Sequence, residues 1–174
     1  MSDETKIITV TTSDKKSITL DSYVAKMSLV IKNMIEDIGE DNHEIMLPNV
    51  SSKILAILTN YCQHVSLHPR TDDEQYKMKR SAFNDYIPDW EKFFIENLDF
   101  NTLIETISAA DYLDINNLID IGCRCIANMI RGKTPNEICE IFGVKGGPES
   151  FSEKEKEDVY MEFPWTQPKV ASDE

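Results

Sequence analysis

The chain has 174 residues and is strongly acidic, with 31 aspartates and glutamates against 18 lysines and arginines and a formal net charge of −13. Hydrophobic residues make up 41% of the sequence and charged residues 28%, as in an ordinary globular domain. Binding to nucleic acid and adsorption on anionic membranes both depend on clustered lysines and arginines, so the charge argues against both classes of partner.

We expect a cytoplasmic and nuclear protein whose cysteines are reduced. The polar segment from Met1 to Thr5 is not an export signal, and no apolar run approaches the roughly 18 residues that a membrane span needs. Without export, the four cysteines are expected to be free thiols. They lie at positions 62, 123, 125 and 139.

The amino-terminal segment has the patterns of a small sheet with one helix. Residues 6–12 and 17–20 alternate apolar and polar side chains on either side of a polar turn, which predicts a β-hairpin. Apolar residues at helical spacing then predict a helix that Ser28 caps and Gly39 ends. Residues 45–47 predict a short third strand.

A clear helix and a long polar segment come next. Ser51 begins the clearest amphipathic pattern of the chain, whose apolar stripe reaches Val65. Residues 68–85 are polar and have no sustained periodicity, and loops of this length are uncommon inside compact domains. We therefore expect residues 68–85 to form a mobile insertion.

Helical patterns dominate the rest of the chain. Residues 116–131 are apolar on most sides, which predicts a helix in the middle of the core. Residues 134–137 (TPNE) and 152–155 (SEKE) have the spacing of capping boxes and predict the start of two more helices. Strands followed by helices indicate the α+β class.

The last 26 residues combine negative charge with large apolar side chains. From Glu149 to Glu174 there are eight acidic residues and three lysines, a net charge of −5. A short charged helix leaves little local core to cover the apolar residues in this stretch. We expect it to bind a partner, with its acidity keeping it in solution and steering basic partner segments. Within this stretch lie the apolar residues Phe151, Val159, Tyr160, Met161, Phe163 and Trp165.

No catalytic pattern stands out in the sequence. His64 and His68 lie four residues apart beside Cys62, a spacing compatible with zinc, but no fourth ligand is evident, and solvated histidines at a helix end are the simpler interpretation. Cys123 and Cys125 lack the Cys-x-x-Cys spacing, and the apolar stripe around Cys125 favours small core residues. We therefore expect no catalytic residue, no metal and no cofactor.

Three segments of the sequence resemble a known family. LPNVSSKIL at 47–55, IPDWEKFF at 87–94 and AADYLDINNLIDIGCRCIANMIRGKTPNEICEIF at 109–142 are similar to the S-phase kinase-associated protein 1 family, the Skp adaptors of SCF ubiquitin ligases. The likeness extends from about Lys6 to Trp165. It implies a BTB/POZ-type α+β domain followed by two carboxy-terminal helices, with one surface for a cullin scaffold and another for the F-box of a substrate receptor.

The resemblance implies an F-box-binding surface across the last helices. Core packing is the alternative for Ile126, and packing on their own domain is the alternative for Ile138 and Phe142. Trp165 is the strongest candidate because a tryptophan after Pro164 has few internal neighbours. The implied F-box-binding residues are Ile126, Ile138, Phe142, Val144 and Trp165.

For cullin binding, the family motif Asn-Tyr-Leu-Asp corresponds to a segment that begins with Asp111 and Tyr112. Aspartate at this first position replaces a neutral amide, which is both donor and acceptor, with a charged acceptor. We expect this difference to weaken cullin binding or to select a particular cullin. The alternative for Tyr112 is an amphipathic residue at a helix end with its hydroxyl in water.

The resemblance also predicts how the chain is divided. We expect the amino-terminal part of the BTB/POZ domain over residues 1–67, a mobile insertion over 68–85 and the helical remainder of the BTB/POZ domain over 86–131. The F-box-binding helices are expected over 132–165 and a disordered tail over 166–174.

Two other functions remain open at this point. One is a self-associating BTB-fold scaffold with lost or weakened cullin binding, which Asp111 would favour and which would form a homodimer in the absence of an F-box protein. The other is a small metal-dependent enzyme, which rests only on Cys62, His64 and His68.

Overall fold

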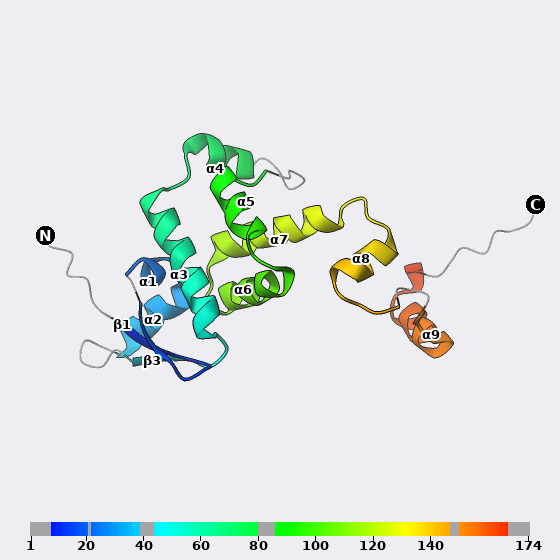
Figure 1. The fold of residues 1–174 in the computed structure, drawn as a ribbon, viewed down its shortest axis with the longest axis horizontal. Coiled ribbons are helices and arrows are strands. Elements are labelled where there is room, and N and C mark those ends of the chain that lie inside the picture. The colour runs from blue at the N-terminus through cyan, green and yellow to red at the C-terminus, as the bar shows by residue number, and fades with distance from the viewer. Residues whose placement is uncertain (1–7, 21, 39–43, 80–85, 147–149, 167–174) are drawn as a thin grey trace, which may run out of the picture. The chain divides into compact units, whose positions relative to one another are not determined.

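The chain divides into two compact units, residues 1–128 and residues 129–174. Figure 1 shows the fold in a computed structural model. Within the part of the chain that the structure describes, no helix is long and apolar enough to cross a membrane. The described residues are 8–20, 22–38, 44–79, 86–146 and 150–166.

A three-stranded sheet begins the first unit. Strand β1 (Ile8–Thr12) pairs antiparallel with β2 (Ser17–Leu20) and parallel with β3 (Glu44–Leu47), so the strand order is β2-β1-β3. Side chains of β1 alternate between buried and half-buried, as expected of a strand with one face on the core. The predicted hairpin and third strand are confirmed, and together with the helices below they confirm the α+β class.

Two helices stand where the sequence predicts one. Helix α1 (Ser22–Met27) precedes α2 (Leu29–Ile38), and Ser28 between them caps α2 as predicted, since its Oγ accepts a hydrogen bond from the Ile31 backbone N–H at 3.1 Å. With only six residues, α1 is too short to give a helical hydrophobic period. The predicted end at Gly39 lies outside the described residues.

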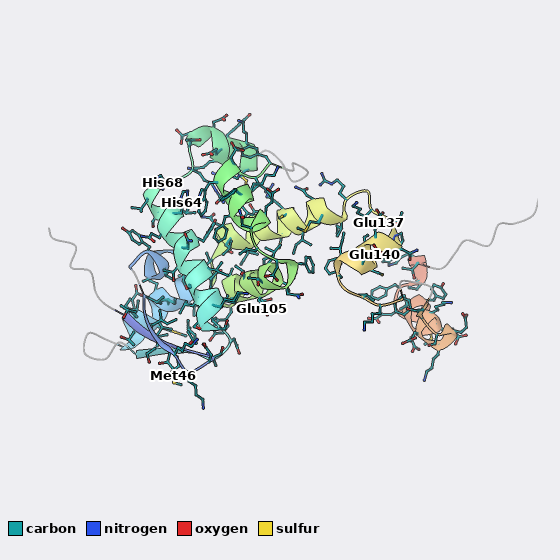
Figure 2. The ribbon with its side chains drawn as sticks, viewed as in Figure 1. Met46, His64, His68, Glu105, Glu137 and Glu140 are labelled. Atoms are coloured by element: carbon teal, nitrogen blue, oxygen red, sulfur yellow. The ribbon has the colours of Figure 1, made fainter. Side chains whose placement is uncertain are left out.

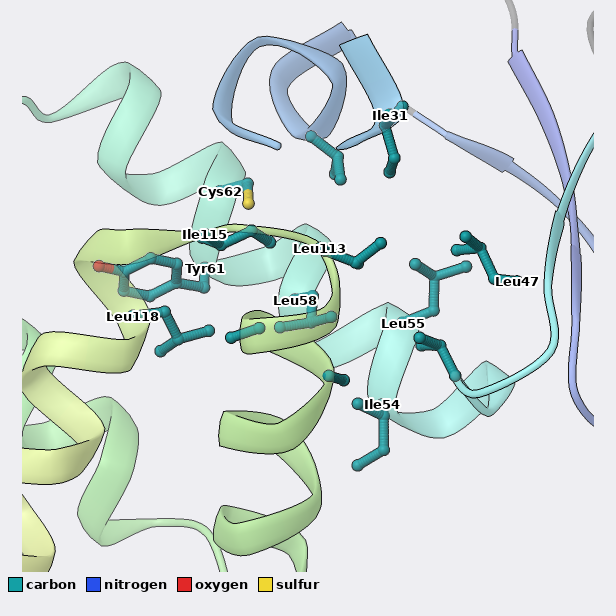
Figure 3. Packing of buried hydrophobic residues seen from close by; sticks show 14 of the residues in the cluster. Ile31, Leu47, Ile54, Leu55, Leu58, Tyr61, Cys62, Leu113, Ile115 and Leu118 are labelled. Carbon is teal, nitrogen blue, oxygen red and sulfur yellow. The ribbon is translucent and has the colours of Figure 1, made fainter. Parts of the chain in front are cut away.

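Helix α3 (Ser52–Leu67) supplies the centre of the core. Ser51 caps it through a hydrogen bond from the Ile54 N–H, in agreement with the predicted start. Figure 3 shows its buried side chains beside buried residues of α2, of β3 and of the segment after α6 (Phe100–Tyr112). The buried residues of α3 are Ile54, Leu55, Leu58, Tyr61 and Cys62.

Residues 68–85 were predicted to form a mobile insertion loop, but eight of them form helix α4 (Asp72–Lys79). Thr71 and Glu74 make a capping box, in which the Glu74 carboxylate accepts from the Thr71 N–H at 2.8 Å and the Thr71 hydroxyl accepts from the Glu74 N–H at 3.3 Å. Met78 is the one buried residue of α4, so this helix has no hydrophobic period to detect. Residues 80–85 lie outside the described residues.

A buried ion pair links the segment just before α4 to helix α5 (Asp89–Glu96). Arg70 donates to the Glu91 carboxylate from Nη2 at 2.8 Å and from Nε at 3.2 Å, and Tyr61 donates its hydroxyl to the same carboxylate at 2.9 Å. The Glu91 side chain is only 4% exposed. Burial and the neighbouring Glu91 charge raise the pKa of Tyr61, so its hydroxyl remains a donor.

Helix α7 (Asn116–Ile130) is buried along only part of its length, which corrects the prediction that it lies in the middle of the core. Leu118, Ile121 and Cys125 are buried, whereas Cys123 and residues 127–129 are exposed. Apolar composition predicted full burial, but the packed neighbours extend only as far as residue 126. Cys125 is a small core residue as predicted, and Cys123 is not.

We predict that Arg70→Met lowers the free energy of unfolding by about 3 to 5 kcal/mol at pH 7, because the buried Glu91 carboxylate then has no counter-charge. Adding Glu91→Gln to Arg70→Met removes the stranded charge and should recover part of the loss. Urea unfolding measures both variants. The control is Lys92→Met, which replaces a cation that is 58% exposed. A loss in Arg70→Met no larger than in this control would contradict the account.

Candidate protein-interaction surfaces

The end of helix α6 presents the residues predicted to bind a cullin. The chain reverses through a Schellman turn, in which the Ile115 N–H donates to the Ala110 carbonyl at 2.8 Å and the Asp114 N–H donates to the Asp111 carbonyl at 3.1 Å. Asp114 is in the left-handed region, with φ of 54°. Aspartate tolerates this conformation better than most residues.

A buried serine anchors this turn from another helix. The Ser28 hydroxyl donates to the Leu113 carbonyl at 2.6 Å, and the Leu113 side chain is fully buried. Asp111 is exposed at the surface, while Tyr112 is half-buried and packs against the core. The turn therefore holds Asp111 and Tyr112 in a fixed place, and their role in cullin binding stays a prediction.

Helix α8 (Pro135–Ile141) is fixed at both ends by its own sequence. Thr134 and Glu137 form the predicted capping box, with Pro135 in the first turn. At the other end, the Val144 N–H donates to the Cys139 carbonyl at 2.8 Å around Gly143, whose φ is 67°. Figure 2 shows Glu137 and Glu140 on this helix. These local bonds define α8 without any buried side chain.

Helix α9 (Glu153–Glu162) begins in the same way. Ser152 and Glu155 form the second predicted capping box. Lys156 Nζ forms an ion pair with Glu153 Oε1 at 2.7 Å. A 3-10 turn, η2 (Pro164–Thr166), follows and brings the rings of Phe163 and Trp165 edge to face, with centroids 6.2 Å apart.

The second unit has no apolar core among its described residues. None of the described residues in 129–166 is buried. Large apolar side chains are exposed instead, and Trp165 reaches 83%. Large apolar side chains gathered at a surface commonly indicate an interaction site, and Phe163 and Trp165 lie together in this way. The exposed large hydrophobic residues of this unit are Met129, Phe142, Val144, Phe151, Val159, Met161, Phe163 and Trp165.

The five predicted F-box-binding residues fall into two groups. Ile126 belongs to the first unit and packs half-buried against its core, which fits the packing alternative. Ile138 is half-buried, while Phe142 and Val144 are 43% and 50% exposed. Trp165 is the most exposed of the five. Met161 is 76% exposed and belongs to the apolar residues of the carboxy-terminal stretch that the sequence predicts to bind a partner, although it is not among these five.

Cys62, His64 and His68, the residues of the alternative zinc interpretation, have different surroundings. Cys62 is buried, and burial raises the pKa of its thiol to about 12, which opposes the thiolate that zinc needs. His64 stacks on Trp90 with ring centroids 3.4 Å apart, and on His68 at 4.5 Å. Figure 2 shows His64 on α3 and His68, the residue that follows this helix, beside it. Among the described residues, no group of three or more histidine, cysteine and acidic side chains could hold a metal ion.

The comparisons with known proteins place the chain in the Skp1 family. Residues 6–66 match the model of the Skp1 family tetramerisation domain, and residues 116–166 match that of the Skp1 family dimerisation domain. The chain belongs to this family, in agreement with the resemblance seen in the sequence.

Curated relatives match over almost their whole length. The chain is 42% identical over 163 residues to the SCF ubiquitin ligase complex protein SKP1a of Dictyostelium discoideum, with 94% of this chain and 97% of that protein covered. It is 37% identical over 163 residues to the suppressor of kinetochore protein 1 of Schizosaccharomyces pombe, covering 92% and 97%. The E3 ubiquitin ligase complex SCF subunit sconC of Arthroderma benhamiae is 36% identical over 164 residues, covering 94% and 96%.

We predict that acid weakens the start of α9. Hydrogen bonds from the Ser152 hydroxyl and backbone N–H hold the pKa of Glu155 below its ordinary value of 4.5. The stabilisation is therefore present above pH 4.5 and is lost as the pH falls through the lowered pKa. An NMR titration of the Glu155 carboxyl checks this. Ser152→Ala should return its pKa toward 4.5 and Ser150→Ala should not; an unchanged pKa in Ser152→Ala would contradict the assignment.

Proposed function

We propose that the chain is an adaptor subunit of an SCF-type E3 ubiquitin ligase, which joins a cullin scaffold to F-box substrate receptors and is not itself catalytic. The observation that carries the proposal is the exposed apolar surface of the second unit, in a chain whose relatives are named as SCF complex subunits. We further propose that it works in the cytoplasm and the nucleus.

The second unit is the proposed F-box-binding part. Its exposed Phe142, Val144 and Trp165 would lose contact with water when a partner covers them, and burial of such side chains contributes roughly 25 cal/mol per Å². Aromatic residues are frequent hot spots of protein interfaces. Ile126 and Ile138 are proposed to contribute less, because both are already half-buried.

The turn after α6 is the proposed cullin-binding part of the first unit. The Schellman turn and the Ser28 hydrogen bond fix the backbone of Asp111 and Tyr112, so little conformational entropy is lost when a partner binds. Asp111 offers only acceptor oxygens where the family motif has an amide, and a cullin surface with a donor or a cation would suit it better.

We predict that Trp165→Ala weakens binding of a purified F-box domain at least tenfold, because an interface hot spot contributes about 2 kcal/mol or more. Isothermal titration calorimetry measures the affinity, and circular dichroism checks the fold. Phe93→Ala is the matched control, since Phe93 is an aromatic residue of the first unit that is 66% exposed. Equal affinities for the two variants would contradict the assignment of Trp165, and no binding by the unaltered chain would overturn the proposed function.

Self-association is the second candidate function. The same exposed apolar residues would be covered equally well by a second copy of the chain, and the family model that matches residues 116–166 is described as a dimerisation domain. Light scattering with and without the F-box domain separates the two functions. A dimer that the F-box domain leaves intact would favour the scaffold, and a dimer that it dissociates would favour the adaptor.

A further inference from the structure

A pocket of about 680 Å³ lies in the first unit between the end of α3, helix α4 and the start of α7. Its size is within the usual range for ligand sites. Arg70, Lys79 and Arg124 line it together with the carboxylate of Asp120. The F-box and cullin residues proposed above are not among the residues that line this pocket.

The two arginines of the pocket are fixed in place by the protein. Arg70 is bound to the buried Glu91 carboxylate and also donates from Nη1 to the Asn117 side-chain oxygen at 3.4 Å. Arg124 donates from Nε to Asp120 at 3.0 Å and from Nη2 to the Met78 carbonyl at 3.3 Å. Their side chains are only 15% and 21% exposed. A ligand therefore meets ordered guanidinium groups and does not have to immobilise two long side chains.

Among the described residues of the lining, one cation has no carboxylate beside it. Glu91 pairs with Arg70 and Asp120 pairs with Arg124, whereas Lys79 is exposed and adds a positive charge to this part of the lining. The side-chain oxygen of Asn117 is turned toward Arg70, which orients its amide nitrogen as a donor. Hydrogen-bond donors together with the Lys79 cation favour an anionic ligand.

Apolar groups line the same pocket. Val65 of α3 and Met78 of α4 face it beside Pro69. An inorganic anion has no apolar group to pack against these side chains. A peptide that alternates acidic and apolar side chains can contact both the charged and the apolar part of the lining.

We propose that this pocket, formed where α4 packs beside α7, is a docking site for an acidic segment of a partner protein, in which carboxylates meet Lys79 and Asn117 and an apolar side chain covers Val65 and Met78. The proposal goes beyond the adaptor function and does not depend on F-box or cullin binding. Helix α4 makes the site, because it supplies Gln75, Met78 and Lys79 to the lining.

The test is a fluorescence polarisation titration of the full chain with a labelled peptide that alternates glutamate and leucine. A matched peptide with glutamine in place of glutamate is the ligand control. We expect the acidic peptide to bind, the glutamine peptide to bind at least tenfold more weakly, and Lys79→Glu to weaken the acidic peptide about tenfold. Asn117→Asp, which keeps the shape of the side chain and adds a negative charge, should weaken it as well.

Lys32→Glu is the control variant, because it makes the same change of charge at an exposed position of α2 that does not line the pocket. It should alter the affinity less than twofold. No binding of the acidic peptide, or equal losses in Lys79→Glu and Lys32→Glu, would overturn the proposal. Displacement of the peptide by inorganic phosphate at equal concentration would overturn the peptide as the ligand. Isothermal titration calorimetry is expected to give the Lys79→Glu variant the same affinity for the F-box domain as the unaltered chain.

Discussion

The arrangement of this protein depends on where the burial of apolar side chains ends. From the first strand to the middle of α7, buried residues of the sheet and helices form one continuous cluster around α3. After Ile126 no described residue is buried, although large apolar side chains continue to Trp165. The first unit therefore has the hydrophobic core of a stable domain, whereas the described residues of the second have apolar surface and form no core.

Local hydrogen bonds define the second unit in place of a core. Capping boxes begin α8 and α9, and a Schellman turn at Gly143 ends α8. Such bonds contribute about 1 kcal/mol each, and isolated helices of seven or ten residues are marginal in water. The unit is thus shaped by its sequence but not strongly stabilised, which suits a surface that gains its packing from a partner.

Much of this organisation was predictable from the sequence, and the failures have physical causes. The sheet, the caps at Ser28, Ser51 and Ser152, and the α+β class follow from alternation and cap spacing, which are local signals. Helix α4 was missed because its capping box stands before a helix with one buried residue, so hydrophobic periodicity had nothing to detect. The exposed end of α7 was missed because composition does not tell whether packed neighbours are present. The pocket beside α4 is lined by residues that are far apart in the sequence, so no local sequence pattern predicts it.

In the proposed adaptor, the second unit gains its packing from an F-box partner. Amide hydrogen exchange of the full chain, with and without a purified F-box domain, tests it most directly, since exchange reports local stability residue by residue. In the free chain, amides of α8 and α9 should exchange far faster than those of α3, and the F-box domain should slow them at least tenfold while leaving α3 unchanged. Protection of α8 and α9 equal to that of α3 in the free chain, with no effect of the F-box domain, would contradict the account.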